Sequence, residues 1–184
     1  NPTTEESLGL LIEEQRTNLL TYSSDFSNAV WTKTNSSITT AADIAPDGTL
    51  TACKVVESTD NALHGVTQIA STSAVAHTLT IYAKAGERSW ILLGNNQITN
   101  GRAWFNLSTG TKGTLGSGAI SSDISPVGNG WYRCSLTFTA TTSATYFIYA
   151  CASDNTLGYT GDGYSGILIW GAQLEAGSFA TSYI

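Results

Sequence analysis

Charged residues are scarce in this sequence, and methionine is absent altogether. Asp, Glu, Lys and Arg make up 12% of the 184 residues, about half of the share of roughly 25% that is usual in globular proteins. A long helical protein needs such residues, together with Ala and Leu, along its surface. The composition therefore excludes a helical bundle. Disorder is also excluded, because hydrophobic residues reach 41% and aromatic residues 10%, enough for a full-sized core.

Basic residues are especially few, with eight Lys and Arg against fourteen Asp and Glu and a formal net charge of −6. They are scattered singly, so they form no patch that could neutralise a row of phosphates. Nucleic acid and anionic membrane surfaces are therefore poor candidates as partners. No stretch approaches the roughly 18 consecutive apolar residues of a membrane span, and nothing in the first residues predicts a signal segment. We expect the sequence to be a domain cut from a longer protein.

The three cysteines, Cys53, Cys134 and Cys151, form no CxxC pair. This argues against a disulfide framework or a zinc site. Each has apolar or β-branched neighbours, which predicts buried thiols that act as small hydrophobic side chains. A bridge between Cys134 and Cys151 on adjacent strands remains the alternative.

Catalytic signatures are equally scarce. The two histidines, His64 and His77, lie in no GxSxG or HExxH motif. The acidic residues cluster near the N-terminus and in turns, where Asp usually stabilises the turn itself. Pairs of carboxylates brought together from distant strands would escape this test. We therefore expect a protein that is not an enzyme.

The hydrophobic pattern predicts short β-strands separated by clusters of Gly, Asn, Asp and Ser. Because no helical period lies between them, an all-β fold of antiparallel β-sandwich type, a jelly roll, is expected. A single domain over residues 1–184 is expected, with one short helical turn over 25–31 that Ser24 or Asp25 would cap. The expected strands are 78–86, 89–94, 101–110, 128–138, 144–152 and 165–175, with further strands at 8–13, 50–56 and 63–69.

Several of these strands carry aromatic residues on the face opposite their apolar one. In 101–110, Trp104 lies between Arg102 and Asn106, opposite Ala103 and Phe105. The same chemistry recurs where Lys84 neighbours Tyr82 and where Arg133 neighbours Trp131. Sugar rings stack on aromatic planes while their hydroxyls bond to Arg, Asn and Asp. The pattern favours sugar binding, but aromatic residues lining the interior of the sandwich remain the alternative.

Longer motifs carry a family resemblance. The opening GLLIEEQRTNLLTYSSDFSNAVWTK (9–33) and the closing ILIWGAQLEAGSFATSYI (167–184) resemble a domain of bacteriophage tail- and head-fibre proteins. Between them, YAKAG (82–86), AWFNLSTG (103–110) and GNGWYRCSLTF (128–138) follow in the order that this family shows. The resemblance covers essentially the whole chain, and it implies a location on the virion surface or outside the cell.

More loosely, the sequence resembles the β-jelly-roll carbohydrate-binding modules of xylanases and related glycosidases. That resemblance implies a sugar-binding concave sheet with exposed aromatics, for which the candidates are Trp104, Trp90 and Tyr82 with Arg102, Lys84 and Arg133. It also implies a structural calcium ion joining the two ends of the domain, with Asp25 and Glu175 as ligands. The last strand departs from that family, since it reads Gln173-Leu174-Glu175 where a carboxylate pair is usual.

Three functions are compatible with these observations. The favoured one is a non-catalytic carbohydrate-binding module that binds polysaccharide or a bacterial surface glycan, and in it Trp104→Ala would abolish binding without unfolding. The second is a structural or oligomerisation domain of a phage fibre without a glycan ligand, forming a homo-oligomer in the parent fibre. The third, a glycan lyase or hydrolase on a jelly-roll scaffold, is the least favoured.

Overall fold

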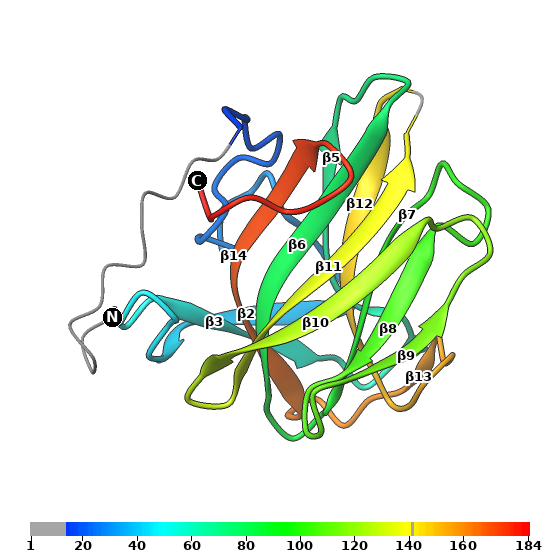
Figure 1. The fold of residues 1–184 in the computed structure, drawn as a ribbon. Coiled ribbons are helices and arrows are strands. Elements are labelled where there is room, and N and C mark those ends of the chain that lie inside the picture. The colour runs from blue at the N-terminus through cyan, green and yellow to red at the C-terminus, as the bar shows by residue number, and fades with distance from the viewer. Residues whose placement is uncertain (1–13, 141) are drawn as a thin grey trace.

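The computed structural model of the protein describes residues 14–140 and 142–184. They form two large antiparallel β-sheets that pack face to face as a β-sandwich, confirming the predicted fold class (Figure 1). The described ranges contain no α-helix, and hence none with the length and apolarity that a membrane crossing requires.

Each sheet has six strands. In hydrogen-bonded order, sheet A consists of β1 (Thr32–Thr34), β5 (His64–Ala70), β12 (Ala144–Cys151), β7 (Trp90–Asn95), β8 (Arg102–Asn106) and β9 (Thr111–Leu115). In the same order, sheet B consists of β10 (Ser121–Gly128), β11 (Trp131–Thr139), β6 (Ala76–Ala85), β14 (Gly166–Ala176), β3 (Ala52–Glu57) and β2 (Ser36–Asp43). A small ladder pairs β4 (Asn61–Ala62) with β13 (Tyr159–Thr160). Successive strands cross repeatedly between the sheets, as in a jelly roll.

The expected strands are present wherever the structure describes them, and the expected strand at 8–13 lies outside the described residues. The strands that the pattern did not reveal are short or polar. In β2, β9 and β10 most side chains are exposed, and β2 and β10 each pack a single isoleucine, Ile38 or Ile124, against the core. These three strands lie at sheet edges, where only one neighbour constrains them.

The core between the sheets is built from the inward faces that the alternation predicted. From β6 it takes Leu79, Ile81 and Ala83, and from β8 Ala103 and Phe105, all fully buried. Cys134, Leu136 and Phe138 of β11 join it from sheet B, and β3, β5, β7, β12 and β14 contribute further buried residues. Each strand therefore presents its other side chains to the outer face of its sheet.

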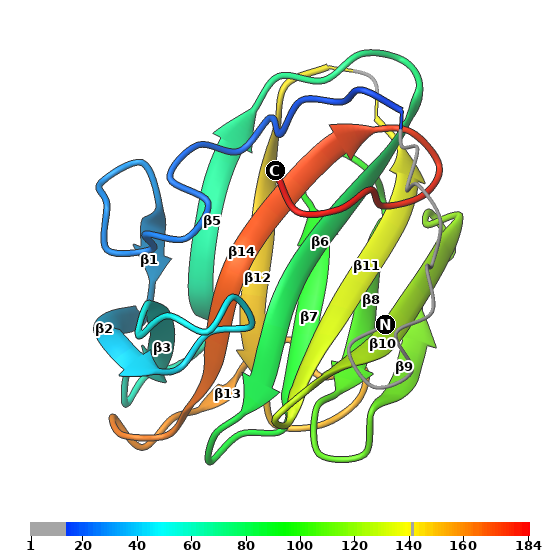
Figure 2. The same ribbon diagram turned by 60° about the vertical axis from the view of Figure 1, so that its left-hand side comes forward.

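A β-bulge in β14 explains the WGAQLE segment. The pairing of β14 with β6 shifts between Trp170 and Gln173, and Gly171 takes a left-handed φ of 64°. An extra residue in that conformation suits glycine. After the bulge, Ala172 and Leu174 face the core while Gln173 and Glu175 lie on the outer face. The C-terminal segment then turns back across β14 and β6 (Figure 2).

The predicted helical turn over 25–31 is instead a series of tight turns. The amide of Asn28 bonds to the carbonyl of Asp25, and that of Trp31 to the carbonyl of Asn28, each spanning three residues. The Asp25 Oδ1 accepts hydrogen bonds from the amide of Ser27 at 3.1 Å and from its hydroxyl at 2.5 Å. Asp25 thus stabilises a turn, as expected of it, without starting a helix.

All three cysteines are buried free thiols, as predicted. Cys134 lies in the core between the sheets, whereas Cys151 belongs to a cluster on the outer face of sheet A, so the two do not form the alternative bridge. Burial raises the pKa of each thiol, that of Cys151 to about 12. The thiolate that would attack a reagent is therefore scarce at neutral pH.

We expect the native protein to be inert toward a thiol reagent such as Ellman's reagent, because the three thiols are buried and protonated. In denaturant all three should react. The measurement is the absorbance of the released chromophore with and without guanidinium. Fast reaction of a thiol in the native protein, or fewer than three titratable thiols after unfolding without reductant, would contradict this expectation.

Candidate glycan-binding faces

The six residues predicted to bind sugar lie on the outer faces of the two sheets, not on one. Trp90, Arg102 and Trp104 point outward from sheet A, where Trp90 and Trp104 join an apolar cluster with Leu92 and Tyr149. Tyr82, Lys84 and Arg133 point outward from sheet B. None of the six belongs to the core between the sheets, which excludes the alternative that these aromatics line the interior of the sandwich. Their assembly into a single site was wrong, because β7 and β8 belong to sheet A whereas β6 and β11 belong to sheet B.

Trp104 is also unsuited to stacking on a ligand. Only 1% of the residue is exposed, and its indole Nε1 donates a hydrogen bond of 2.9 Å to the carbonyl of Thr156. The connection between β12 and β13 therefore covers this ring. Trp90, at the other end of the same cluster, is half-buried and packs where a Cβ on Gly113 would lie. Trp104 is therefore buried beneath the surface of sheet A, and its ring is not available to a ligand.

Beside Trp104, the outer face of sheet A is hollowed into a groove of about 420 Å³. We call this hollow the sheet A groove. Its floor consists of outward-facing residues of β5, β12, β7 and β8. It is lined by Thr34, Leu63, Thr67, Leu92, Asn96, Arg102, Thr145, Phe147, Tyr149 and Leu157. A further hollow of about 360 Å³ continues it past Thr67 and Thr145 toward Ile69 and Val30.

Two aromatic rings of β12 form the centre of the sheet A groove. Phe147 and Tyr149 stack with their centroids 4.9 Å apart and their planes within 5°. Each is paired with a glycine of a neighbouring strand, Phe147 with Gly94 and Tyr149 with Gly65. A Cβ on Gly94 would lie 2.5 Å from the Phe147 ring, and one on Gly65 would lie 2.6 Å from the Tyr149 ring. The glycines therefore make room for the rings on the sheet.

Polar groups surround these rings. Arg102 lies over the Trp104 ring at 5.4 Å and donates a hydrogen bond of 2.6 Å to the side chain of Asn100. It forms no ion pair with any described carboxylate, so most of its donors remain available. Burial raises the pKa of Tyr149 above its usual value, and this effect outweighs a hydrogen bond with Thr34 that lowers the pKa. Tyr149 is therefore a neutral phenol at pH 7.

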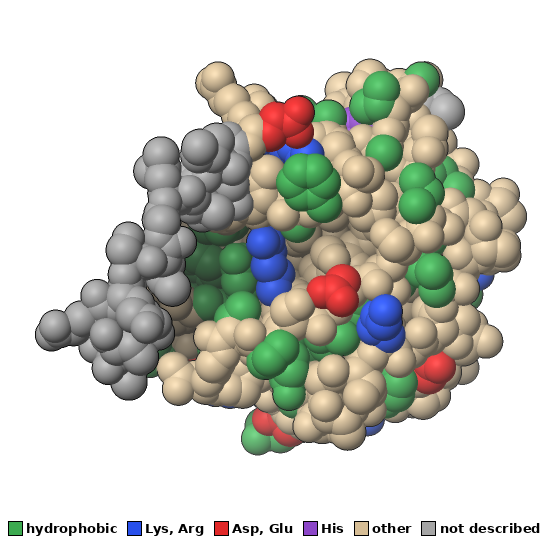
Figure 3. Space-filling model, in the orientation of Figure 1, with side chains coloured by type: hydrophobic (Ala, Val, Ile, Leu, Met, Phe, Trp, Pro, Cys, Tyr) green, Lys and Arg blue, Asp and Glu red, His purple; other side chains and the backbone are tan. Residues whose placement is uncertain are grey.

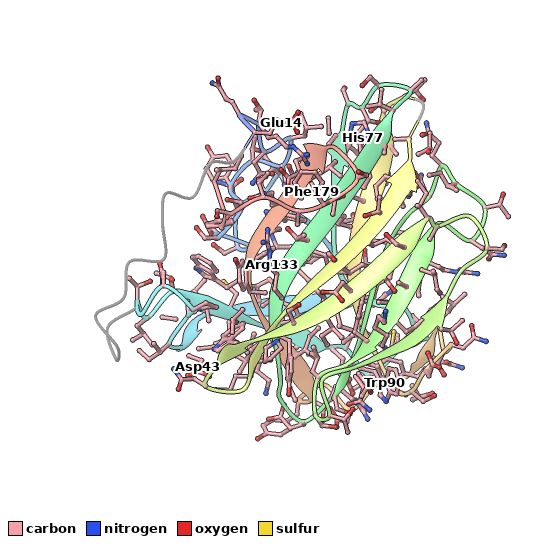
Figure 4. The ribbon with its side chains drawn as sticks, viewed as in Figure 1. Glu14, Asp43, His77, Trp90, Arg133 and Phe179 are labelled. Atoms are coloured by element: carbon pink, nitrogen blue, oxygen red, sulfur yellow. The ribbon has the colours of Figure 1, made fainter. Side chains whose placement is uncertain are left out.

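The residues on sheet B have different surroundings. Lys84 forms an ion pair of 2.7 Å with Asp43, and Tyr82 packs edge-on against Trp170 at 5.4 Å. Arg133 lies over the Tyr82 ring at 5.5 Å, under the C-terminal segment. Figure 4 labels Asp43 and Arg133 on this face and Trp90 near the lower edge of the molecule. Lys84 is thus paired with a carboxylate, and the Tyr82 ring packs against Trp170 and Arg133 within the fold.

The two proposed calcium ligands do not fit a shared ion. The Glu175 carboxylate is fully buried and accepts hydrogen bonds from the Thr181 amide at 2.8 Å, the Thr181 hydroxyl at 2.7 Å and Gln173 Nε2 at 2.9 Å. Arg16 Nη1 lies 3.7 Å away, supplying the positive charge. Both carboxylate oxygens of Glu175, which a calcium ion would need as ligands, thus already accept hydrogen bonds from the protein. Among residues 14–140 and 142–184, no three His, Cys, Asp or Glu side chains gather as a metal site would require.

Phe147 and Asn96 are site residues that the sequence interpretation missed. Segment 144–152 carries apolar side chains on both faces, so the alternation along it did not single out Phe147 as an outward residue. The glycines across from the rings were the available signal, but they become informative only once the strand pairing is known.

Compared with known protein families and with characterised proteins, the chain matches none.

Proposed function

We propose that this protein is a non-catalytic glycan-binding module and that the sheet A groove is its binding face. The observation that carries the proposal is the half-buried ring of Phe147, which forms the floor of a groove bordered by Arg102 and Asn96. A pyranose ring has one apolar face for an aromatic floor and hydroxyls at its rim for such donors and acceptors. The resemblance to phage fibre domains supports a place on a virion surface.

The open shape of the groove suits a chain more than a small molecule. The second hollow, past Thr67 and Thr145, extends the same face, so several sugar units of a polysaccharide could lie along it. Weak binding by each copy would suffice, since a fibre presents several copies and avidity multiplies their affinity. No carboxylate, imidazole or thiol is among the described residues that line the groove, which favours binding over hydrolysis.

The test is affinity electrophoresis of the native protein through gels that contain xylan, β-glucan, mannan or a bacterial surface polysaccharide. We expect retardation by one polymer class and a loss of at least about tenfold in affinity for Phe147→Ala and Arg102→Ala. Tyr164→Ala is the matched control, because Tyr164 is 67% exposed and lies over Lys54 of sheet B, away from the groove. Adding EDTA tests the calcium prediction in the same gels.

A structural or oligomerisation domain is the second candidate, and one observation favours it. Ile69 is 71% exposed and borders the same hollow as Val30, which is 41% exposed. Such an apolar edge could pack against another copy. A stable oligomer in sedimentation that Ile69→Ser dissociates, together with no retardation by any polysaccharide, would replace the glycan-binding proposal with this one.

A further inference from the structure

The outer face of sheet B carries a second hollow, which we call the sheet B trough. It measures about 460 Å³ and lies under the C-terminal segment, on the face that Figure 3 presents to the viewer. Nine of its twelve lining residues carry a hydroxyl group or a charge, and three are apolar. The lining residues are Thr78, Ser121, Ser122, Asp123, Ser125, Val127, Arg133, Ser135, Thr137, Ser178, Phe179 and Ala180.

Strand register arranges the floor of this trough in rows. Outward-facing residues that are cross-strand partners on β10, β11 and β6 lie side by side. The rows are Ser121–Thr137–Thr78, Asp123–Ser135–Thr80 and Ser125–Arg133–Tyr82. The described contacts give no side-chain hydrogen bond to Ser121 or Ser135, so their hydroxyls can bond to a ligand.

Arg133 supplies the donors at one end of the trough. Its guanidinium lies on the Tyr82 ring and one Nη2–H bonds to the carbonyl of Thr181. It belongs to no ion pair among the described residues, and its Nε is buried there without a hydrogen-bond partner. A buried donor without a partner is costly and rare in folded proteins. The group is fixed by stacking, yet its hydrogen-bonding capacity is largely unused.

Asp123 and Phe179 provide the complementary chemistry. Asp123 accepts a hydrogen bond of 2.8 Å from the Ser125 hydroxyl, which leaves most of its lone pairs open. Phe179 is 57% exposed, and Arg16 covers its ring at 4.2 Å. Arg16 Nη1 also donates a hydrogen bond of 2.7 Å to the carbonyl of Phe179, so the ring is held in place above the trough (Figure 4).

We infer that the sheet B trough is a second binding site and that its ligand is an uncharged saccharide unit. Arg133 would donate to the ligand's hydroxyl oxygens and Asp123 would accept from its hydroxyl groups, with Ser121 and Ser135 serving either role. A neutral polyol satisfies both charges, whereas an anion would face Asp123 and a cation would face Arg133. The inference depends on the proposed function for the class of ligand only, since none of these residues belongs to the sheet A groove.

The trough and the groove lie on opposite faces of the sandwich, so a ligand at one leaves the other free. The two sheets of the sandwich expose their outer faces in opposite directions, so the groove and the trough can bind separate chains. A domain with two such sites would bridge polysaccharide strands, and each site would raise the local concentration of ligand at the other.

The experiment is an amide chemical-shift titration of the protein with the methyl glycosides of glucose, galactose, mannose and xylose, and with glucuronic acid as the anionic probe. We expect at least one neutral glycoside to shift residues 121–125, 133–137 and 178–180. Arg133→Gln should weaken this response by roughly tenfold or more. Asp123→Asn should also weaken the response, although it leaves the hydrogen bond between Arg133 and the Thr181 carbonyl in place. Phe147→Ala should leave the response of the trough unchanged.

Each outcome decides the inference separately from the proposed function. Shifts in the trough that survive Phe147→Ala support the second site even if the groove binds nothing. Shifts confined to the groove, or a trough response that Arg133→Gln and Asp123→Asn both leave intact, overturn the second site and leave the groove untouched. A trough response to glucuronic acid alone overturns the assignment to an uncharged ligand.

Discussion

Glu57→Gln should destabilise the protein by about 3 kcal/mol, because it removes the charge from a fully buried carboxylate that several groups share. Glu57 accepts hydrogen bonds from Arg88 Nε at 2.8 Å and Nη2 at 2.6 Å, and from the Tyr159 hydroxyl at 2.6 Å. The amide of Asp162 donates to it as well, at 2.9 Å. The residue thereby ties β3 to β13 and to the loop before β14. The measurement is the free energy of unfolding from urea titration.

The matched control is Glu87→Gln. Glu87 also forms an ion pair, with Lys54 at 2.7 Å, but 37% of its side chain is exposed. Solvent screens such a pair, so its loss should cost less than about 1 kcal/mol. Equal losses for the two substitutions would show that the buried network around Glu57 contributes no more than a surface pair does.

The effect of Glu57 should also depend on pH. Burial raises its pKa, but the hydrogen bonds from Arg88, Tyr159 and the Asp162 amide outweigh burial and hold the pKa below its ordinary value of 4.5. A lowered folded-state pKa gives stability that is complete above the unfolded-state pKa and is lost as the pH falls through the folded-state value. The difference between wild type and Glu57→Gln should therefore be constant at neutral pH and shrink below about pH 4.5.

Trp104→Ala should unfold or strongly destabilise the protein, at a cost of about 3 to 5 kcal/mol. The side chain is 1% exposed and packs with Leu92, Tyr149 and Cys151. Its loss leaves a cavity under the sheet A groove and frees the carbonyl of Thr156, to which the indole donates. The readout is the urea midpoint together with the tryptophan emission spectrum.

Trp104→Phe helps to separate the two contributions, since it removes the hydrogen bond but keeps most of the aromatic side chain. It should cost about 1 kcal/mol for that bond, and somewhat more for the lost volume. Phe147→Ala on the same face should cost less than Trp104→Ala, because Phe147 is only half-buried. A Trp104→Ala protein as stable as wild type would contradict the burial of this ring beneath the loop at Thr156 and restore Trp104 as a surface residue.

The sequence alone predicted the strands of the core and their faces well. Leu79, Ile81 and Ala83 alternate with Thr80, Tyr82 and Lys84, and burial follows that alternation. Edge strands such as β2 and β10 were missed because their polar side chains carry no signal of which face is buried. The left-handed position at Gly171 was hidden for a similar reason, since a bulge depends on what the neighbouring strand pairs with.

The candidate site shows the same division more sharply. The sequence favoured an outward direction for Trp104, Tyr82 and Arg133, because they lie opposite the apolar residues of their strands, but it left the interior of the sandwich open as the alternative. Only the tertiary structure decided which sheet each strand joins and what covers it. Loop residues around Thr156 bury Trp104, while the glycines of β5 and β7 leave room on the sheet for the rings of Tyr149 and Phe147. Periodicity is a local property, whereas strand pairing and loop coverage come from contacts between residues far apart in the chain.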